Sequence, residues 1–229
     1  MIELVVLDMA GTTVNEHGIV YRALEDSVTA TGATVDAADL QTWMGADKTE
    51  AIAALMELGG VKADPGVVAK QFAHFRAMLA ERYAANPPEA LPGVEDALRA
   101  LKARGIKIGL TTGFSRDVAA PILETLGWEI GQGQLLDAVV TSDEVAAGRP
   151  APYMIHRVME ATGVHDVRAV VAGGDTVVDL LAAHHAGVKG LGVLTGALGR
   201  EELERHPHSW VLEGAKDLPS VLESALVSR

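Results

Sequence analysis

Cysteine is absent from the 229 residues of this chain. The absence excludes disulfide bonds, a thiolate nucleophile, and zinc or iron–sulfur sites held by cysteine. A chain without disulfides suits a reducing compartment, and we therefore expect a cytoplasmic location. The first eight residues contain no basic segment followed by a long apolar stretch, so we expect no signal peptide.

Basic residues are scarce, and no apolar run approaches the ~20 residues that span a bilayer. Lysine and arginine number 19 against 31 aspartates and glutamates, which gives a formal net charge of −12. A nucleic-acid-binding protein normally presents a basic face, so we expect no nucleic acid among the partners. Because no apolar run is long enough to span a bilayer, we expect no membrane either. An anionic small molecule stays a candidate substrate if a metal ion or a few cations offset the negative field at its pocket.

The remaining composition is that of a globular protein, with 48% hydrophobic and 22% charged residues. At this length, one large or two small domains are expected. Short apolar runs rich in branched side chains alternate with helical segments, which predicts an α/β fold with a parallel sheet flanked by helices. The predicted strands are residues 2–7, 106–110, 138–141, 169–172 and 190–194, and the helices between them are 94–104, 116–126, 152–162 and 177–186.

The segment 15–91 differs, because it shows helical periodicity and no strand-like run. Clusters rich in Asn, Gly and Pro flank it and have the character of linkers. We therefore predict an α/β core domain of residues 1–14 and 92–229, with an all-helical domain of residues 15–91 inserted after the first strand like a lid. Its predicted helices are residues 21–31, 36–44, 48–58 and 65–85.

Polar residues follow the predicted strands at points that a parallel sheet brings to one edge. Asp8 ends the first strand, Thr112 and Gly113 end the second, and Asp175 follows the fourth. Arg149 comes a few residues after the third strand. Ligands of such sheets bind beyond the carboxyl ends of the strands, so we expect these groups to meet there.

These residue types suit phosphate chemistry. A carboxylate beside a glycine turn can act as a nucleophile or a metal ligand, and a Thr hydroxyl with a Gly amide suits phosphate oxygens. Arg149 offers a forked donor to an anion. Asp175 and Asp179 lie four residues apart at the start of a predicted helix and share one face. Together with Asp8 they offer oxygen ligands for Mg²⁺.

Each feature alone also has a purely structural explanation. A strand-end Asp is often a helix cap, Thr-Thr-Gly is a common turn, and two acids at a helix start complement its dipole. An Arg before Pro is commonly a surface residue. All four features occur in this order, each at or just after a predicted strand. This combination favours a functional site over the structural explanations.

Together, the segments 8–13, 110–113, 148–150 and 174–179 resemble the motifs of the haloacid dehalogenase (HAD) superfamily of aspartate-nucleophile phosphotransferases. The resemblance covers essentially the whole chain and implies a Rossmann-like core with an inserted helical cap. Most members carry Asp-x-Asp in the first motif and Lys in the third, whereas this chain has Ala10 and Arg149. With Ala10 and Arg149 at these positions, the chain resembles the phosphonatase-like branch of the superfamily, the phosphonoacetaldehyde hydrolases. That branch carries Met-Gly-x-x-Lys in the cap, and this chain reads Met-Gly-Ala-Asp-Lys at 44–48.

The resemblance implies a role for each residue. Asp8 is expected to be the nucleophile, Lys48 the amine that forms a Schiff base with substrate, and Arg149 and Thr112 the groups that stabilise the phosphoryl group. The Ala10 side chain cannot transfer a proton. When the substrate carbonyl has become a protonated imine, however, the carbon fragment can leave as an enamine, and no acid is needed at position 10. The implied substrate is phosphonoacetaldehyde or a related 2-oxoalkyl phosphonate, cleaved at its C–P bond through an aspartyl phosphate.

Mg²⁺ is the metal ion that the resemblance implies. Its expected ligands are Asp8, the main-chain carbonyl of Ala10 and Asp175, with Asp179 at the same site behind them. Thr12 is expected to orient Asp8, and the Gly113 amide to contact phosphate. Met44 and Gly45 are expected beside the substrate.

Two positions depart from the branch, which has a His three residues after the catalytic Lys and a Tyr after Thr-Thr-Gly. Here Ala51 and Phe114 stand in those places, which favours a related phosphonate aldehyde or ketone over phosphonoacetaldehyde itself.

Two alternatives stay open. One is a phosphatase of small monoesters, such as phosphoglycolate or a sugar phosphate, and Ala10 argues against it. The other is a catalytically weak phosphate-binding relative, and the retention of Asp8, Thr112, Arg149 and Asp175 argues against that. Relatives of this branch pair through their caps, so the resemblance also implies a homodimer.

Overall fold

The computed structural model describes residues 1–43 and 46–227, in which the chain forms two compact units. The first unit comprises Met1–Asn15 and Glu89–Arg229, and the second comprises Glu16–Pro88. The sequence prediction placed the boundaries after residues 14 and 91. Residues 89–91 fall in the first unit because β2 (Val14–Asn15) pairs antiparallel with β3 (Glu89–Ala90), which joins the two linkers in a short ribbon.

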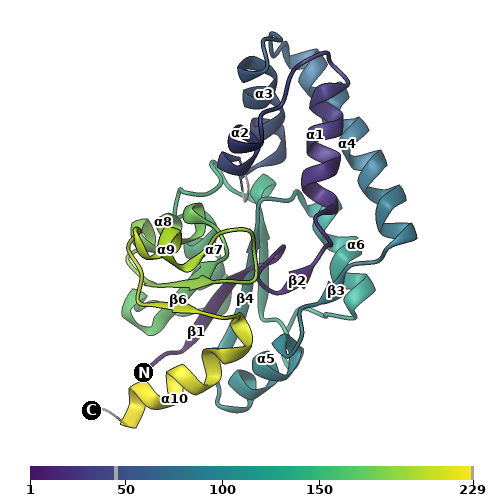
Figure 1. The fold of residues 1–229 in the computed structure, drawn as a ribbon. Coiled ribbons are helices and arrows are strands. Elements are labelled where there is room, and N and C mark those ends of the chain that lie inside the picture. The colour runs from purple at the N-terminus through teal and green to yellow at the C-terminus, as the bar shows by residue number, and fades with distance from the viewer. Residues whose placement is uncertain (44–45, 228–229) are drawn as a thin grey trace. The chain divides into compact units, whose positions relative to one another are not determined.

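The first unit is built on a six-stranded sheet in which every neighbouring pair of strands is parallel (Figure 1). The strand order is β5-β4-β1-β6-β7-β8, so β1 lies between β4 and β6. The predicted α/β fold with a parallel sheet is confirmed. The strands are β1 (Leu4–Asp8), β4 (Lys107–Thr112), β5 (Ala138–Thr141), β6 (Val170–Gly174), β7 (Lys189–Val193) and β8 (Trp210–Leu212).

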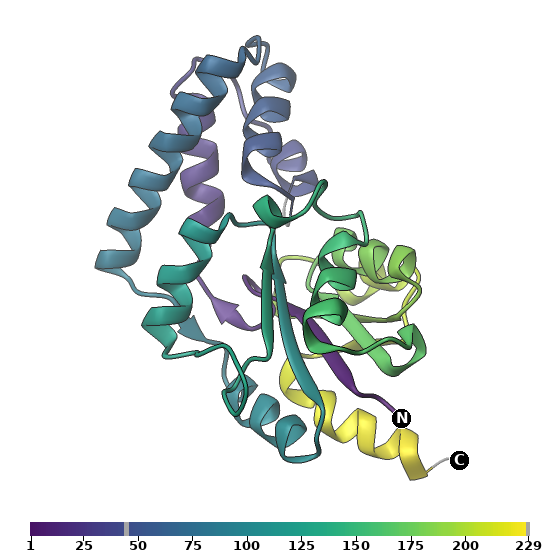
Figure 2. The ribbon, with the colours of Figure 1, turned by 180° about the vertical axis from the view of Figure 1, so that it is seen from behind.

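Both faces of the sheet are covered by helices (Figures 1 and 2). On one face, α7 and α8 pack together against the strands, while α5 packs against β4 and α10 packs against α5. The helices of this unit are α5 (Val94–Ala103), α6 (Arg116–Leu126), α7 (Tyr153–Thr162), α8 (Val177–Ala186), α9 (Arg200–Glu204) and α10 (Leu218–Val227), with 3-10 turns η1 (Ser142–Glu144), η2 (Val167–Ala169) and η3 (Ala215–Asp217).

The central strand explains why the sheet needs two helical layers. All five residues of β1 are buried. Leu4 and Val6 belong to the cluster that contains Val158 of α7 and Ala183 of α8. Because successive side chains of a strand point to opposite faces, Val5 and Leu7 face the other layer. A strand that is apolar on both sides is stable only when both sides are covered, as in parallel sheets generally.

The strand order reverses its direction next to β1. From β1 the chain moves outward to β4 and β5 on one side, and it then returns to β6 and β7 on the other side. Ligands of open α/β sheets bind in the crevice at such a switch point, beyond the carboxyl ends of the strands. In this fold the crevice lies between the ends of β1 and β6.

The second unit is entirely helical in its described residues. α1, α3 and α4 pack against one another, and Leu24, Ile52 and Phe75 are fully buried. The side chains of Asp36, Asp47 and Asp64 accept backbone N–H groups where three of the helices begin, as N-caps do. The helices are α1 (Ile19–Thr29), α2 (Ala37–Thr42), α3 (Lys48–Leu58) and α4 (Pro65–Ala85).

Several elements were not predicted. β2 and β3 have two residues each, and β8 has three half-buried ones, so none is long enough to show an alternating pattern. Their strand geometry comes from the partners with which they pair. None of the helices in the described residues is long and apolar enough to cross a membrane.

Candidate active site

Asp8 is the last residue of β1 and opens a tight loop. The Thr13 hydroxyl donates to the Asp8 carbonyl at 2.9 Å, and the N–H groups of Thr13 and Val14 donate to the Met9 carbonyl at 2.9 and 2.8 Å. Gly11 has a φ of +82°, in the left-handed region that favours glycine. These bonds hold the backbone of residues 8–14, and therefore the place of the buried Asp8 carboxylate at the sheet edge.

Asp175 follows β6 and meets Asp8 at the crevice. Its Oδ1 accepts a hydrogen bond from the Thr12 hydroxyl at 2.9 Å. Thr12 was expected to orient Asp8, whereas in the structure its hydroxyl donates to Asp175. The loop after β1 and the end of β6 are thus tied together at the carboxylate pair.

Asp179 lies in the first turn of α8 and is fully engaged. Its Oδ2 accepts the backbone N–H of Thr176 at 3.1 Å, and the Thr176 side chain accepts the backbone N–H of Asp179 in return, which makes a capping box. The Thr176 hydroxyl also donates to Asp179 Oδ2. Its Oδ1 pairs with Arg149. This carboxylate therefore fixes the start of α8 and one end of the guanidinium.

Arg149 bridges two carboxylates. One guanidinium nitrogen, Nη2, lies 2.7 Å from Asp8 Oδ1, and the other, Nη1, contacts Asp179 Oδ1. The Arg149 side chain is only 3% exposed. A fork of this kind suits two partners at once because its donors are held in one plane.

Burial shapes the electrostatics of the cluster. Burial raises the pKa of Asp8 to about 7, although the Arg149 charge opposes the rise. Burial, followed by the charges of Asp8 and Asp179, raises the pKa of Asp175 well above its ordinary range. Burial works against the charge on Arg149, but the charges of Asp179 and Asp8 outweigh it and raise its pKa. Ionising all three carboxyl groups would therefore place more negative charge in the site than its one guanidinium can balance.

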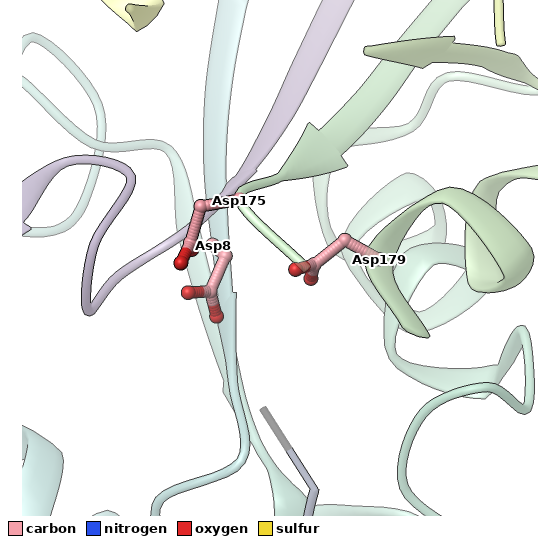
Figure 3. Close-up of side chains that lie close together, drawn as sticks. All are labelled: Asp8, Asp175 and Asp179. Atoms are coloured by element: carbon pink, nitrogen blue, oxygen red, sulfur yellow. The ribbon is translucent and has the colours of Figure 1, made fainter. Parts of the chain in front are cut away.

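A divalent cation fits this imbalance. Carboxylate oxygens from Asp8, Asp175 and Asp179 lie within 4.8 Å of one another, and all three residues are buried. Figure 3 shows the three side chains together, from the end of β1, the end of β6 and the first turn of α8. Three ionised carboxylates with one guanidinium leave a net charge of −2, and hard oxygen ligands are those that Mg²⁺ prefers.

Thr112 and Gly113 lie at the end of the neighbouring strand. Asp8 pairs with Thr111 in the sheet register, so Thr112 is one residue beyond it at the same edge. The Thr112 hydroxyl accepts the backbone N–H of Phe114 at 3.1 Å, which tightens the loop. Ala10 lies in the loop after Asp8 and forms an isolated bridge with Val14.

Lys48 belongs to the second unit, where it begins α3 directly after the N-cap Asp47. Its side chain is buried, and its Nζ donates to the Ala46 carbonyl at 2.6 Å. Met44 and Gly45, which were expected beside the substrate, lie outside the described residues. The roles expected for these residues stay predictions.

Two contacts of the site were missed by the sequence analysis. Gly196, in the turn after β7, approaches the Asp175 carboxylate so closely that a Cβ there would meet Oδ2 at 1.9 Å. His185, at the end of α8, donates from Nδ1 to the carbonyl of Pro150, the neighbour of Arg149. Thr195-Gly196 directly follows the predicted strand 190–194, and Thr112-Gly113 comes after the predicted strand 106–110 with one residue between, so a similar signal was present there.

Comparison with known proteins agrees with the geometry. A family model for haloacid dehalogenase-like hydrolases matches residues 2–187. A phosphonoacetaldehyde hydrolase from Bacillus cereus is 32% identical over 219 residues, which cover 89% of this chain and 81% of that protein.

Two solved structures share the fold. One is a hydrolase from Pseudomonas syringae, with a TM-score of 0.85, 22% identity and coverage of 98% of this chain and 99% of that one. The other is a phosphonoacetaldehyde hydrolase-like protein from Oleispira antarctica, with a TM-score of 0.81, 23% identity and coverage of 97% and 92%. The family match and the B. cereus relative lead to one conclusion: the chain is a hydrolase of the haloacid dehalogenase-like family, in its phosphonatase-like branch.

Proposed function

We propose that this protein is a Mg²⁺-dependent phosphonatase that cleaves the C–P bond of phosphonoacetaldehyde or a related 2-oxoalkyl phosphonate. The observation that carries the proposal is the presence of Ala10 two residues after Asp8. The rest of the site, with its three buried carboxylates and Arg149, is in place. An alkoxide leaving group needs a proton donor, and the alanine side chain offers none. The identity with phosphonoacetaldehyde hydrolase supports the same substrate class.

Lys48 performs the activation step in this proposal. Its neutral amine adds to the carbonyl carbon of the substrate, water leaves, and a protonated imine forms. The imine lies beta to phosphorus and withdraws electrons from the C–P bond. The inserted helical unit, which carries Lys48, acts as the cap that delivers this amine.

Asp8 performs the transfer step. A carboxylate oxygen attacks phosphorus, the C–P bond breaks, and its electron pair moves into the C–C bond to give an enamine on Lys48. Protonation at carbon and hydrolysis then release the carbonyl product and the free lysine. Water hydrolyses the aspartyl phosphate to phosphate, so one water is consumed per C–P bond cleaved.

Arg149 and Thr112 stabilise the phosphoryl group during the transfer. The guanidinium that contacts Asp8 is already placed beside the nucleophile, so it needs little reorganisation as charge develops. When Mg²⁺ is bound by Asp8, the Ala10 carbonyl and Asp175, it supplies further positive charge for the phosphoryl oxygens. Asp179 keeps Arg149 in place through its ion pair.

The substrate side chain is proposed to be apolar near the carbonyl. Ala51 is fully buried one turn after Lys48 on α3, and Phe114 is buried beyond the Thr112 loop. Neither offers a proton or a hydrogen bond from its side chain. The lack of a His and a Tyr at these two positions favours a ketone or a substituted aldehyde over phosphonoacetaldehyde itself.

A trapping experiment tests the proposal. The full chain is incubated with phosphonoacetaldehyde and with 2-oxopropyl phosphonate, treated with borohydride, and examined by peptide mass spectrometry. We expect a reduced adduct on Lys48 in the wild type and none in Lys48→Arg, whereas Lys62→Arg, at an exposed lysine of the same unit, behaves as the wild type. Phosphate release is measured in parallel with and without Mg²⁺.

Two outcomes would overturn the proposal. Efficient hydrolysis of phosphoglycolate or a sugar phosphate that survives Lys48→Arg would establish a monoester phosphatase instead. Tight phosphate binding without turnover of any phosphonate or ester would establish a binding protein.

A further inference from the structure

The turn after β7 reaches the candidate metal site from a strand to which no function was assigned. The Thr195 hydroxyl donates to the Gly11 carbonyl at 2.5 Å, which ties this turn to the loop that follows Asp8. The next residue, Gly196, faces the Asp175 side chain. A Cβ at position 196 would lie 1.9 Å from Asp175 Oδ2 and 2.6 Å from its Cγ.

A second glycine approaches the same carboxylate. A Cβ at Gly11 would lie 2.6 Å from Asp175 Oδ2. The Thr12 hydroxyl meets Oδ1. Two positions without a side chain and one hydroxyl thus lie against the Asp175 carboxylate, which has an oxygen within 4.8 Å of oxygens of Asp8 and Asp179.

The two glycines have different reasons for being glycine. Gly11 has a left-handed φ of +82°, so its backbone alone favours glycine. Gly196 has no such φ, so its backbone would accept a side chain. The space taken by the Asp175 carboxylate is therefore what requires glycine at position 196.

We propose that Thr195 and Gly196 are positioning residues that set the affinity of the site for Mg²⁺ by holding the Asp175 carboxylate toward Asp8. The inference rests on the metal-dependent function proposed above. Because Thr195 anchors the turn to the Asp8 loop, the backbone at 196 cannot simply withdraw from a new methyl group. The new methyl group would also lie 2.7 Å from Asp175 Cβ, so rotation of the carboxylate alone cannot relieve the clash. The Asp175 side chain must shift as a whole, and its oxygen then leaves its place in the cluster.

Glycine substitutions with a matched control test this inference. Gly196→Ala is compared with Gly199→Ala, three residues along the same segment, where a Cβ would meet nothing within 4 Å. Mg²⁺ binding to the full chain is measured by calorimetry without substrate, and the fold is checked by circular dichroism. We expect Gly196→Ala to weaken Mg²⁺ binding at least about 10-fold and Gly199→Ala to leave it unchanged.

A hydroxyl series keeps the test decisive if Gly196→Ala does not fold. Thr195→Val removes the bond to Gly11, whereas Thr195→Ser retains a donor. We expect the valine variant to bind Mg²⁺ several-fold more weakly and the serine variant to bind as the wild type does.

The outcomes separate this inference from the proposed reaction. Wild-type Mg²⁺ affinity in Gly196→Ala, or an equal loss in Gly199→Ala, would overturn the positioning role. A wild-type protein that binds no Mg²⁺ would overturn the metal site and this inference with it. A selective loss in Gly196→Ala together with no phosphonate turnover would support the inference and overturn the substrate assignment alone.

Discussion

Arg149 shows how one side chain organises the candidate site at the scale of single residues. It contacts Asp8, the proposed nucleophile, and Asp179, which forms the capping box of α8 with the N-cap Thr176. A lysine has a single ammonium on a flexible stem and cannot present two fixed donors in the same way. The guanidinium therefore links the orientation of the nucleophile to the start of a helix.

Ala10 gives the first prediction at this scale. Ala10→Asp adds a carboxyl group that can protonate an alkoxide, so we expect hydrolysis of a phosphate monoester such as phosphoglycolate to rise on the order of 10²-fold. The measurement is kcat/KM for the ester and for the phosphonate.

Ala10→Asn is the control, because it has the same shape without a transferable proton. An equal gain in the asparagine variant would show that proton transfer at position 10 is not what limits ester hydrolysis.

Two ends of α8 serve the site at the scale of elements. Its first turn carries Asp179, and its last turn carries His185, whose Nδ1 lies 2.8 Å from the Pro150 carbonyl. Arg149 directly precedes Pro150, so α8 holds the loop that carries Arg149 at two points, through Asp179 and through His185. The adjacent residue His184 is exposed.

His185→Ala is predicted to lower kcat by roughly 2- to 10-fold, the effect of one exposed hydrogen bond of ordinary strength. His185→Asn places an amide donor near the position of Nδ1 and is expected to restore most of the rate. Steady-state kinetics and the thermal unfolding midpoint of both variants provide the check. A loss of rate that follows only a loss of thermal stability would contradict a role in holding the Arg149 loop.

The start of α1 contains a buried acid. Glu16 Oε2 accepts the Val20 N–H at 2.7 Å, and burial raises the pKa of Glu16 although bonds from backbone N–H groups oppose the rise. Protonated Glu16 suits this place better than the ion does. The stability that protonated Glu16 contributes is fully present below pH ~4.5, its ordinary pKa. That stability is lost as the pH rises through the raised pKa of the folded protein.

Glu16→Gln is therefore predicted to raise the free energy of unfolding relative to the wild type, by an amount that grows as pH rises above about 4.5 and then levels off. The glutamine oxygen can still accept the Val20 N–H. Urea unfolding of both proteins at several pH values measures the difference. A difference that does not change with pH would refute the buried-acid explanation.

Mg²⁺ is expected to act on the molecule as a whole, since a ligand that binds only the folded state stabilises it by mass action. At a concentration 100 times its Kd, Mg²⁺ is predicted to raise the free energy of unfolding by about 2.7 kcal/mol. Thermal unfolding with Mg²⁺ and with a chelator measures the effect. Asp175→Asn is expected to lose most of it, and an unchanged response in that variant would contradict the assigned ligands.

Two expectations about the whole protein stay predictions. The homodimer through the helical cap rests on the resemblance to the phosphonatase-like branch, and sedimentation of the purified chain measures it. The cytoplasmic location is the other.

Local patterns in the sequence determined the order of the core elements and which residues end the strands. β5, α3, α4, α6 and α8 have the predicted bounds, because apolar periodicity and capping are properties of neighbouring residues. Asp8, Thr112 and Asp175 lie at one sheet edge because parallel strands bring their carboxyl ends together.

The tertiary structure alone decided the contacts between those strand ends. Thr195 bonds to Gly11 across 184 positions, and the Thr12 hydroxyl donates to Asp175 across 163 positions. Arg149 contacts Asp8 and Asp179, two of the three acids of the cluster, and a Cβ at Gly196 would clash with Asp175. Such contacts depend on distances and shapes that exist only in the folded chain, and no pattern of neighbouring residues encodes them.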